Sequence, residues 1–72
     1  MPTIRFFAAA REAVGASTVS VGSGTLGSVL DAFDQPVIAR CSYLVNGISE
    51  EDRSRLVVEG DSVDVLPPFA GG

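Results

Sequence analysis

Several residue types that carry common chemistry are missing from this chain. Its 72 residues contain no histidine, lysine or tryptophan, and only one cysteine, Cys41. Without histidine, neither an imidazole base nor an imidazole metal ligand is available. A single cysteine excludes a disulfide within the chain, which fits a reducing compartment. Without lysine, no surface ammonium group can accept an isopeptide bond, so self-linked polymers of the ubiquitin type are excluded.

Positive charge is also scarce. All five basic residues are arginines, nine residues are acidic, and the net charge is −4. No cluster holds more than two arginines, so the chain lacks the basic patch with which proteins neutralise nucleic-acid phosphates. An acidic surface instead fits a protein partner that has a basic docking site. We therefore expect protein partners and no nucleic acid.

Long apolar segments are absent as well. The longest uninterrupted apolar run, Phe6 to Ala10, is far too short to cross a bilayer. The N-terminal segment shows no basic stretch followed by an apolar core, as a signal peptide would. These features predict a cytoplasmic protein with no membrane association. A chain of 72 residues is one domain with little room for a deep catalytic cleft, so an enzyme that works alone is not expected.

The first third of the chain is patterned as two strands. Apolar residues make up 46% of the sequence, which is enough for a folded core. Alternation over residues 3–8, with Ile4, Phe6 and Ala8 on the same side, and over residues 18–21 predicts two strands that pair like a hairpin. Residues 9–14 between them favour a short helical turn that ends at a glycine.

The middle of the chain predicts one amphipathic helix. Thr25 is a good N-cap, because its hydroxyl can accept a hydrogen bond from an otherwise unpaired backbone N–H. Apolar residues at helical spacing follow it, and Pro36 should stop the helix near residue 34 or 35. The apolar stripe consists of Leu26, Val29, Leu30 and Phe33.

The last third returns to strand patterns. Strands are predicted at residues 43–45, 56–58 and 62–66, with a polar loop or single helical turn over residues 49–55. Asn46-Gly47 supplies the positive φ angles that a tight turn after the first of these strands requires.

This order of elements predicts an α+β fold, in which a small mixed sheet packs on one main helix. The arrangement is the ubiquitin-like β-grasp, with the first and last strands parallel and adjacent. We expect a β-grasp domain over residues 1–66 and a flexible Gly-Gly tail over residues 67–72. The sheet residues predicted to face the helix are Ile4, Phe6, Val19, Val21, Val63 and Val65.

The C-terminal segment, LPPFAGG, is the part of the sequence that carries chemistry. Its two prolines favour an extended backbone. The six residues after Leu66, at about 3.3 Å each, would reach roughly 20 Å from the last strand. Glycines have no Cβ, so they can thread a narrow channel and let a nucleotide phosphate approach the terminal carbon. A terminal carboxylate, with a pKa of about 3.5, is ionised at neutral pH. It can attack the α-phosphate of ATP, and a sulfur nucleophile can then displace AMP and leave a thiocarboxylate.

Two stretches of sequence resemble the MoaD/ThiS family of ubiquitin-like sulfur carriers, most closely the small subunit of molybdopterin synthase. They are residues 4–12, IRFFAAARE, and residues 60–72, GDSVDVLPPFAGG. The Val45-Asn46-Gly47 turn also fits, and the resemblance covers essentially the whole chain. Two features depart from it: the segment from Thr25 to Ser42 is shorter than usual, and Phe69 is bulkier than the usual residue.

The resemblance implies what the tail would do. Gly72 would be adenylated by a ubiquitin-activating-like adenylyltransferase that uses ATP and then become the thiocarboxylate, and Gly71 would enter the partner's active site with it. The sulfur would pass to a precursor held by the molybdopterin synthase large subunit. It could instead pass to another sulfur-accepting enzyme, in the synthesis of thiamine, cysteine or a sulfur-containing secondary metabolite. The chain itself would bind no cofactor or metal and would be a small, non-catalytic subunit.

A patch at the base of the tail is expected to bind these partners. Phe7 and Leu66 alternate away from the face assigned to the helix, and exposed apolar patches often mark partner sites. The expected partner-binding residues are Phe7, Arg11, Leu66, Pro67, Pro68 and Phe69.

Two other classes of protein stay open. One is a ubiquitin-like modifier that is joined through Gly72 to lysines of target proteins. The other is a binding module whose tail is inert. Cys41 could carry a persulfide or thioester, but a lone cysteine in an apolar segment is more often a packed side chain, and no histidine is available to activate it.

The acidic residues are interpreted as solvated charge. Consecutive carboxylates such as Glu50, Glu51 and Asp52 cannot all face one ion, so a metal site is not expected there. Three further carboxylates are interpreted in the same way, as solvated charges that could meet basic residues on an activating enzyme. They are Glu59, Asp61 and Asp64.

Overall fold

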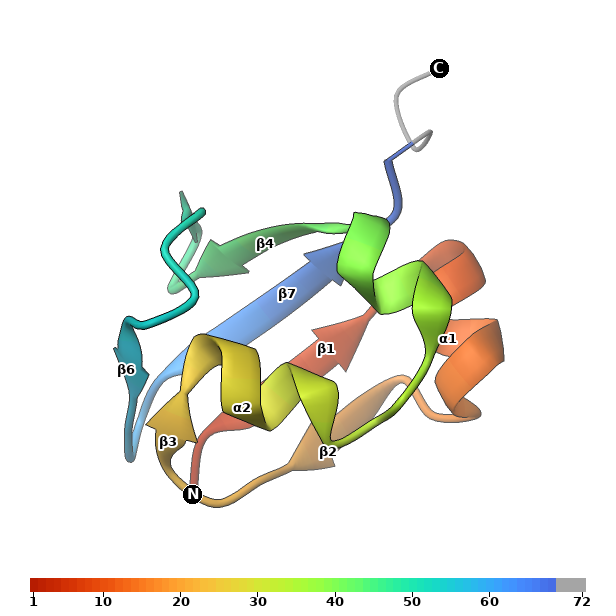
Figure 1. Ribbon diagram of the computed structural model, residues 1–72. Helices are drawn as coiled ribbons and strands as arrows, with labels where there is room; N and C mark the ends of the chain where they lie inside the picture. The colour runs from red at the N-terminus through yellow and green to blue at the C-terminus, as the bar shows by residue number, and fades with distance from the viewer. Residues whose placement is uncertain (69–72) are drawn as a thin grey trace.

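The structure is a computed structural model that describes residues 1–68 as a mixed β-sheet with helices packed on it (Figure 1). The helices are α1 (Ala8–Val14), α2 (Leu26–Asp31) and the 3₁₀ helix η1 (Pro36–Arg40). The strands are β1 (Thr3–Phe6), β2 (Thr18–Ser20), β3 (Gly24–Thr25), β4 (Ser42–Val45), β5 (Ile48–Ser49), β6 (Leu56–Val57) and β7 (Ser62–Leu66).

The main sheet has the strand order β2-β1-β7-β4-β5. Its central strands β1 and β7 run parallel, with Ile4 opposite Val63 and Phe6 opposite Val65. Strand β2 is antiparallel to β1, and β4 is antiparallel to β7. Strands β3 and β6 form a separate two-stranded sheet. The predicted α+β class, the β-grasp arrangement and the parallel pairing of the first and last strands are all confirmed.

The core lies between the sheet and the layer formed by α2 and η1, which cover one face of the sheet (Figure 1). Alternation along β1 and β7 turns every second side chain to this face, and all four of these residues are almost fully buried: Ile4, Phe6, Val63 and Val65. Helix α2 contributes Leu26, Val29 and Leu30, as the helical stripe predicted. Burying each side chain of this size contributes roughly 1.5–3 kcal/mol.

Helix α2 begins where predicted but ends earlier. The Thr25 hydroxyl caps it by accepting a hydrogen bond from the Ser28 N–H at 3.1 Å. The helix stops at Asp31, three residues before the predicted end. Phe33 therefore lies beyond the helix and is only partly buried, with its ring edge-on to Phe6 at a centroid distance of 5.0 Å.

Pro36 acts differently from the prediction. It excludes helical geometry from the residue before it, and Gln35 is extended. However, Pro36 is also the first residue of η1, a helix that the sequence did not predict. Proline suits that position, because its missing N–H would have no helical partner there.

Three strand predictions need correction. Ala8 is not a strand residue that faces the core: it is exposed and begins α1. Val19 and Val21 are only partly buried: Val19 lies on β2, at the edge of the sheet, and Val21 follows the end of that strand. The segment predicted as loop 49–55 starts with the last residue of β5, which pairs with β4.

Two predicted turns are confirmed. Helix α1 ends at Gly15, whose φ is +83° and whose N–H donates to the Arg11 carbonyl. Asn46 and Gly47 join β4 to β5 with φ values of +53° and +83°. No helix within residues 1–68 is both long enough and apolar enough to cross a membrane.

Candidate functional site

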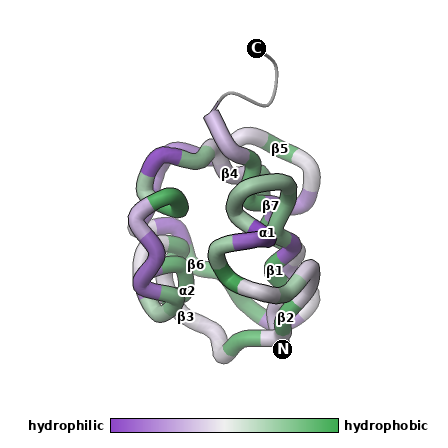
Figure 2. Tube along the Cα trace, turned by 90° about the vertical axis from the view of Figure 1, so that its right-hand side faces the viewer, coloured by the Kyte–Doolittle hydropathy of each residue, from purple (hydrophilic) through white to green (hydrophobic). Residues whose placement is uncertain are grey.

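The chain leaves the domain at one edge of the main sheet. Because β1 and β7 are parallel, their C-terminal ends meet at this edge, and the antiparallel β4 starts there. The pairing of Ser42 with Leu66 and the hydrogen bond from the Phe7 N–H to the Val65 carbonyl, at 3.2 Å, bring these ends together. After β7 the chain continues to Pro68 beyond the end of the sheet that carries α1 (Figures 1 and 2).

The described part of the predicted partner patch is uneven in exposure. Phe7 is 37% exposed, and Arg11 and Pro68 are also exposed. Leu66 is half-buried. Pro67 is buried, so its ring offers little surface to a partner. The other predicted site residues, Phe69, Gly71 and Gly72, lie outside the described residues, as does most of the predicted tail.

The outer face of the sheet holds an ion pair that the sequence reading missed. Arg5 donates from Nε to Asp64 Oδ1 at 2.7 Å and from Nη2 to Asp64 Oδ2 at 2.9 Å. These hydrogen bonds and the carboxylate charge raise the pKa of Arg5 above its usual value. The interpretation of Asp64 as a solvated charge is wrong, because this carboxylate is buried beside Arg5. The parallel register of β1 and β7 places the two residues opposite each other, and only that register reveals the pair.

Cys41 is a packed side chain, as interpreted from the sequence. It is buried, and its Sγ donates a hydrogen bond to the Val37 carbonyl at 3.2 Å. Burial raises the pKa of the thiol, because the thiolate would lose its hydration. The thiol is therefore poorly suited to act as a nucleophile at neutral pH.

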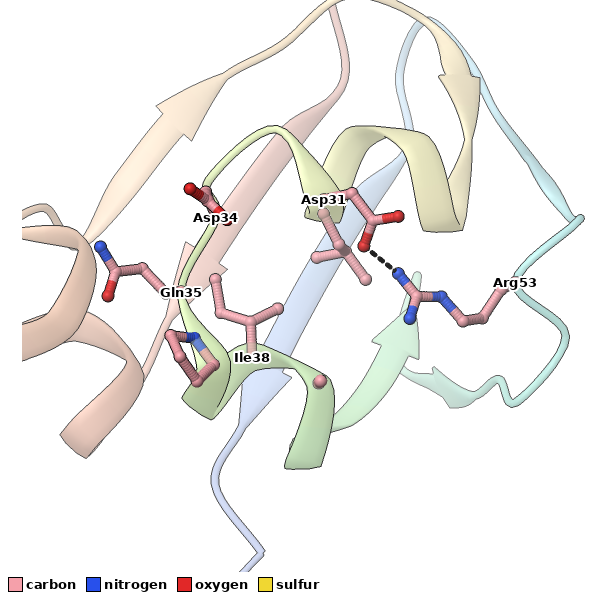
Figure 3. Close-up of a pocket in the computed structure, with 8 residues that line it drawn as sticks. Asp31, Asp34, Gln35, Ile38 and Arg53 are labelled. Atoms are coloured by element: carbon pink, nitrogen blue, oxygen red, sulfur yellow. Dashed lines mark hydrogen bonds and ion pairs between the residues drawn. The ribbon is translucent and has the colours of Figure 1, made fainter.

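A cavity of about 480 Å³ lies on the helical side of the molecule. Figure 3 shows Asp31 and Arg53 at its wall, joined by an ion pair of 2.6 Å, with Ile38 on the opposite side. Asp31, one of the two carboxylates that line this cavity, is therefore already paired with Arg53. Within residues 1–68, no group of three or more acidic or cysteine side chains is arranged to hold a metal ion.

The fold, with a Gly-Gly segment following its last strand, defines the class of protein as ubiquitin-like β-grasp. A family model described as the ThiS family matches residues 4–72. The chain therefore belongs to the ThiS family of ubiquitin-like sulfur carriers.

Solved structures with the same fold agree with this assignment. SAMP1 from Haloferax volcanii is 25% identical, with 99% of this chain and 98% of that chain covered, and a TM-score of 0.75. The Haloferax volcanii HVO 2177 protein is 27% identical, with coverage of 99% and 85%, and a TM-score of 0.77.

A third structure is a complex of subunits 1 and 2 of the molybdopterin-converting factor from Helicobacter pylori 26695. The matching chain is 18% identical, with coverage of 99% and 97% and a TM-score of 0.72, which shows likeness of fold alone. A comparison with curated proteins finds no match.

Proposed function

We propose that this protein carries sulfur as a thiocarboxylate on Gly72 and donates it in molybdopterin biosynthesis. The observation that carries the proposal is the match of the ThiS family model, which extends through the Gly-Gly segment to residue 72. The parallel β1 and β7 direct the chain out of the domain at one edge of the sheet, immediately before that segment. The folded domain is then the part that partners bind, and the tail, residues 67–72, carries the reacting carboxylate of Gly72.

The proposed chemistry has two steps, and a partner enzyme performs both. In the first, a carboxylate oxygen of Gly72 attacks the α-phosphorus of ATP, and pyrophosphate leaves. In the second, sulfur at the oxidation level of sulfide attacks the acyl carbon, and AMP leaves with the bridging oxygen. The carrier supplies an unhindered carboxylate, because glycine has no Cβ to crowd either approach.

Two partners follow from this chemistry. A ubiquitin-activating-like adenylyltransferase would form the adenylate, using ATP that the carrier itself does not bind. The molybdopterin synthase large subunit would then accept the sulfur, and the carrier would be the small, non-catalytic subunit. The Helicobacter pylori structure is a complex of two subunits of a molybdopterin-converting factor, which supports a large-subunit partner for this chain as well.

The surface that these partners would cover lies around the root of the tail. Phe7 and Leu66 present apolar surface there, and Arg11 follows Phe7 by one helical turn. Pro68 and Phe69 would extend this surface along the tail. Buried aromatic side chains tend to dominate the energy of such interfaces. The cytoplasmic location stays a prediction.

Intact-mass analysis tests the proposal directly. After incubation with ATP, the adenylyltransferase and a sulfide donor, the wild-type chain should gain about 16 Da, the difference between sulfur and oxygen. Gly72→Val and a variant with one added C-terminal residue should gain nothing. Gly22→Val is the matched control, since a Cβ at Gly22 would meet no described atom within 4 Å. It should gain the same mass as the wild type.

Other outcomes would point elsewhere. An equal mass gain in the extended chain would place the sulfur on another residue and contradict the proposal. Amide conjugates between Gly72 and lysines of other proteins would indicate a ubiquitin-like modifier. A thiocarboxylated chain that cannot supply sulfur to a molybdopterin synthase large subunit would redirect the pathway to thiamine, cysteine or a secondary metabolite.

A further inference from the structure

A charged pair lies in the middle of the outer face of the sheet, on the side away from α2. Arg5 and Asp64 are opposite each other on the two central strands, and Leu44 of β4 is opposite Asp64 on the other side. The pair is a side-on bidentate contact, in which Nε and Nη2 of Arg5 each donate to one carboxylate oxygen.

This contact leaves part of the Arg5 guanidinium unused. The group has five N–H bonds in a planar fork, and Asp64 accepts only two of them. Both N–H bonds of Nη1 and one of Nη2 therefore point away from Asp64, and within residues 1–68 they have no acceptor. The side chain of Arg5 is 52% exposed, so about half of its surface is open to solvent.

Apolar residues lie near Arg5 on the outer face of the sheet. The Phe7 ring lies under the guanidinium, with its centroid 5.8 Å from Cζ. Leu66 lies two residues beyond Asp64 on the same face of β7, and both it and Leu44 are half-buried. An arginine beside aromatic and aliphatic side chains is a common centre of protein–protein contacts.

Stability alone gives little reason for this pair. Taking Asp64 out of water is unfavourable, and replacing such a pair with apolar residues of similar size is often neutral or stabilising. Apolar residues at both positions would also extend the neighbouring surface of Phe7 and Leu66. A pair that fixes the guanidinium and leaves three of its five N–H bonds free is better suited to recognition.

We propose that the free fork of Arg5 is a specificity-determining contact with the adenylyltransferase that takes up the tail, an inference that rests on the proposed function. The face adjoins Leu66 and Pro68, so a protein that draws the tail into its active site lies over this end of the sheet. The fork receives an uncharged oxygen from that protein, a backbone carbonyl or a side-chain amide. Asp64 already neutralises Arg5 and the chain is acidic, so a second carboxylate would meet net repulsion.

The test replaces both Arg5 and Asp64, so that neither charge is left without its partner. The double variant Arg5→Met/Asp64→Leu is titrated calorimetrically with the adenylyltransferase of the same organism, loaded with ATP. Its dissociation constant should rise roughly 10- to 100-fold, as for loss of a hydrogen bond to a charged group. The control is Arg53→Met/Asp31→Leu, which removes the corresponding pair from the helical side. Its dissociation constant should stay within about twofold of wild type.

A second variant covers the case in which the double variant does not fold. Arg5→Lys keeps the positive charge beside Asp64 but has no planar fork, so it should weaken binding in the same direction. Wild-type affinity in Arg5→Lys, or in a folded double variant, overturns the inference. A change in sedimentation coefficient without a change in partner affinity also overturns it, because the occupant would then be a second copy of the chain.

The mass measurement separates this inference from the proposed function. A wild-type chain that gains no sulfur contradicts the proposed function, whatever the affinities are. A wild-type chain that gains sulfur, together with Arg5 variants that bind normally, contradicts only the role of Arg5.

Discussion

Replacing Leu30 with alanine tests whether α2 packs on the sheet through its apolar stripe. Leu30 is 1% exposed and belongs to the core cluster with Phe6 and Val65. The change removes three buried carbon atoms and leaves a cavity, which should lower the free energy of unfolding by about 2–5 kcal/mol. A domain of this length is stable by roughly 4–11 kcal/mol in total. A loss of about 3 kcal/mol would therefore lower Tm by roughly 12–24 °C.

Leu56→Ala is the matched control for this measurement. Leu56 is 65% exposed on β6, so the same chemical change should alter the free energy of unfolding by no more than about 0.5 kcal/mol. Urea titration followed by circular dichroism gives both values. If Leu30→Ala cost less than about 0.5 kcal/mol, α2 would not be packed on the sheet as the structure shows.

Acid stability and the thiol give two further predictions. Asp61 accepts hydrogen bonds from the Asn46 side chain and the Val58 N–H, which lower its pKa below the ordinary value of 3.8. The Asp61 carboxylate therefore takes up a proton more readily in the unfolded chain than in the folded one. The stability that its ionised form contributes is fully present above pH 3.8 and is lost as the pH falls through the lower folded pKa. Asp61→Asn should flatten this decline in urea titrations at several pH values, and an unchanged slope would contradict the assignment. Cys41→Ala should still gain about 16 Da on activation, because the buried thiol takes no part; loss of that gain in a folded variant would implicate the thiol.

The elements of the core could be predicted because apolar spacing alone specifies them. Alternation in β1 and β7 and the helical stripe from Leu26 to Leu30 each matched the buried residues. The predicted end of α2 is too late, because Phe33 continues the helical spacing of apolar residues although it lies in a turn after the helix. From that turn its ring still packs on Phe6. The spacing of apolar residues cannot show whether Phe33 belongs to the helix or to the turn after it, since its ring packs against the core in either conformation. Helix η1 was missed because Pro36 was interpreted only as a residue that ends a helix, although it also begins one.

The candidate site was predictable only where it depends on local sequence. The Gly-Gly segment and the turn at Asn46 are recognised from adjacent residues. The contact between Arg5 and Asp64 joins residues 59 positions apart, and it follows from a strand register that no local pattern contains. Asp64 was therefore assigned to solvent on its charge alone. The half-burial of Leu66 depends in the same way on neighbouring strands.

The fold itself accounts for how a small domain can hold the start of a C-terminal tail in a fixed place. The last strand is central in the sheet, paired with β1 on one side and with β4 on the other. Both neighbouring strands therefore pair with the chain as far as Val65, Leu66 still pairs with Ser42 of β4, and Pro67 is buried. In the proposed function, a partner that binds Phe7 and the outer face of β7 would thus fix the starting point of the tail before the tail enters its active site. Fixing that point would limit how far the terminal carboxylate can lie from the nucleotide and would raise its effective concentration there. In that reaction the domain would contribute by positioning the tail, while the partner would supply the catalytic groups.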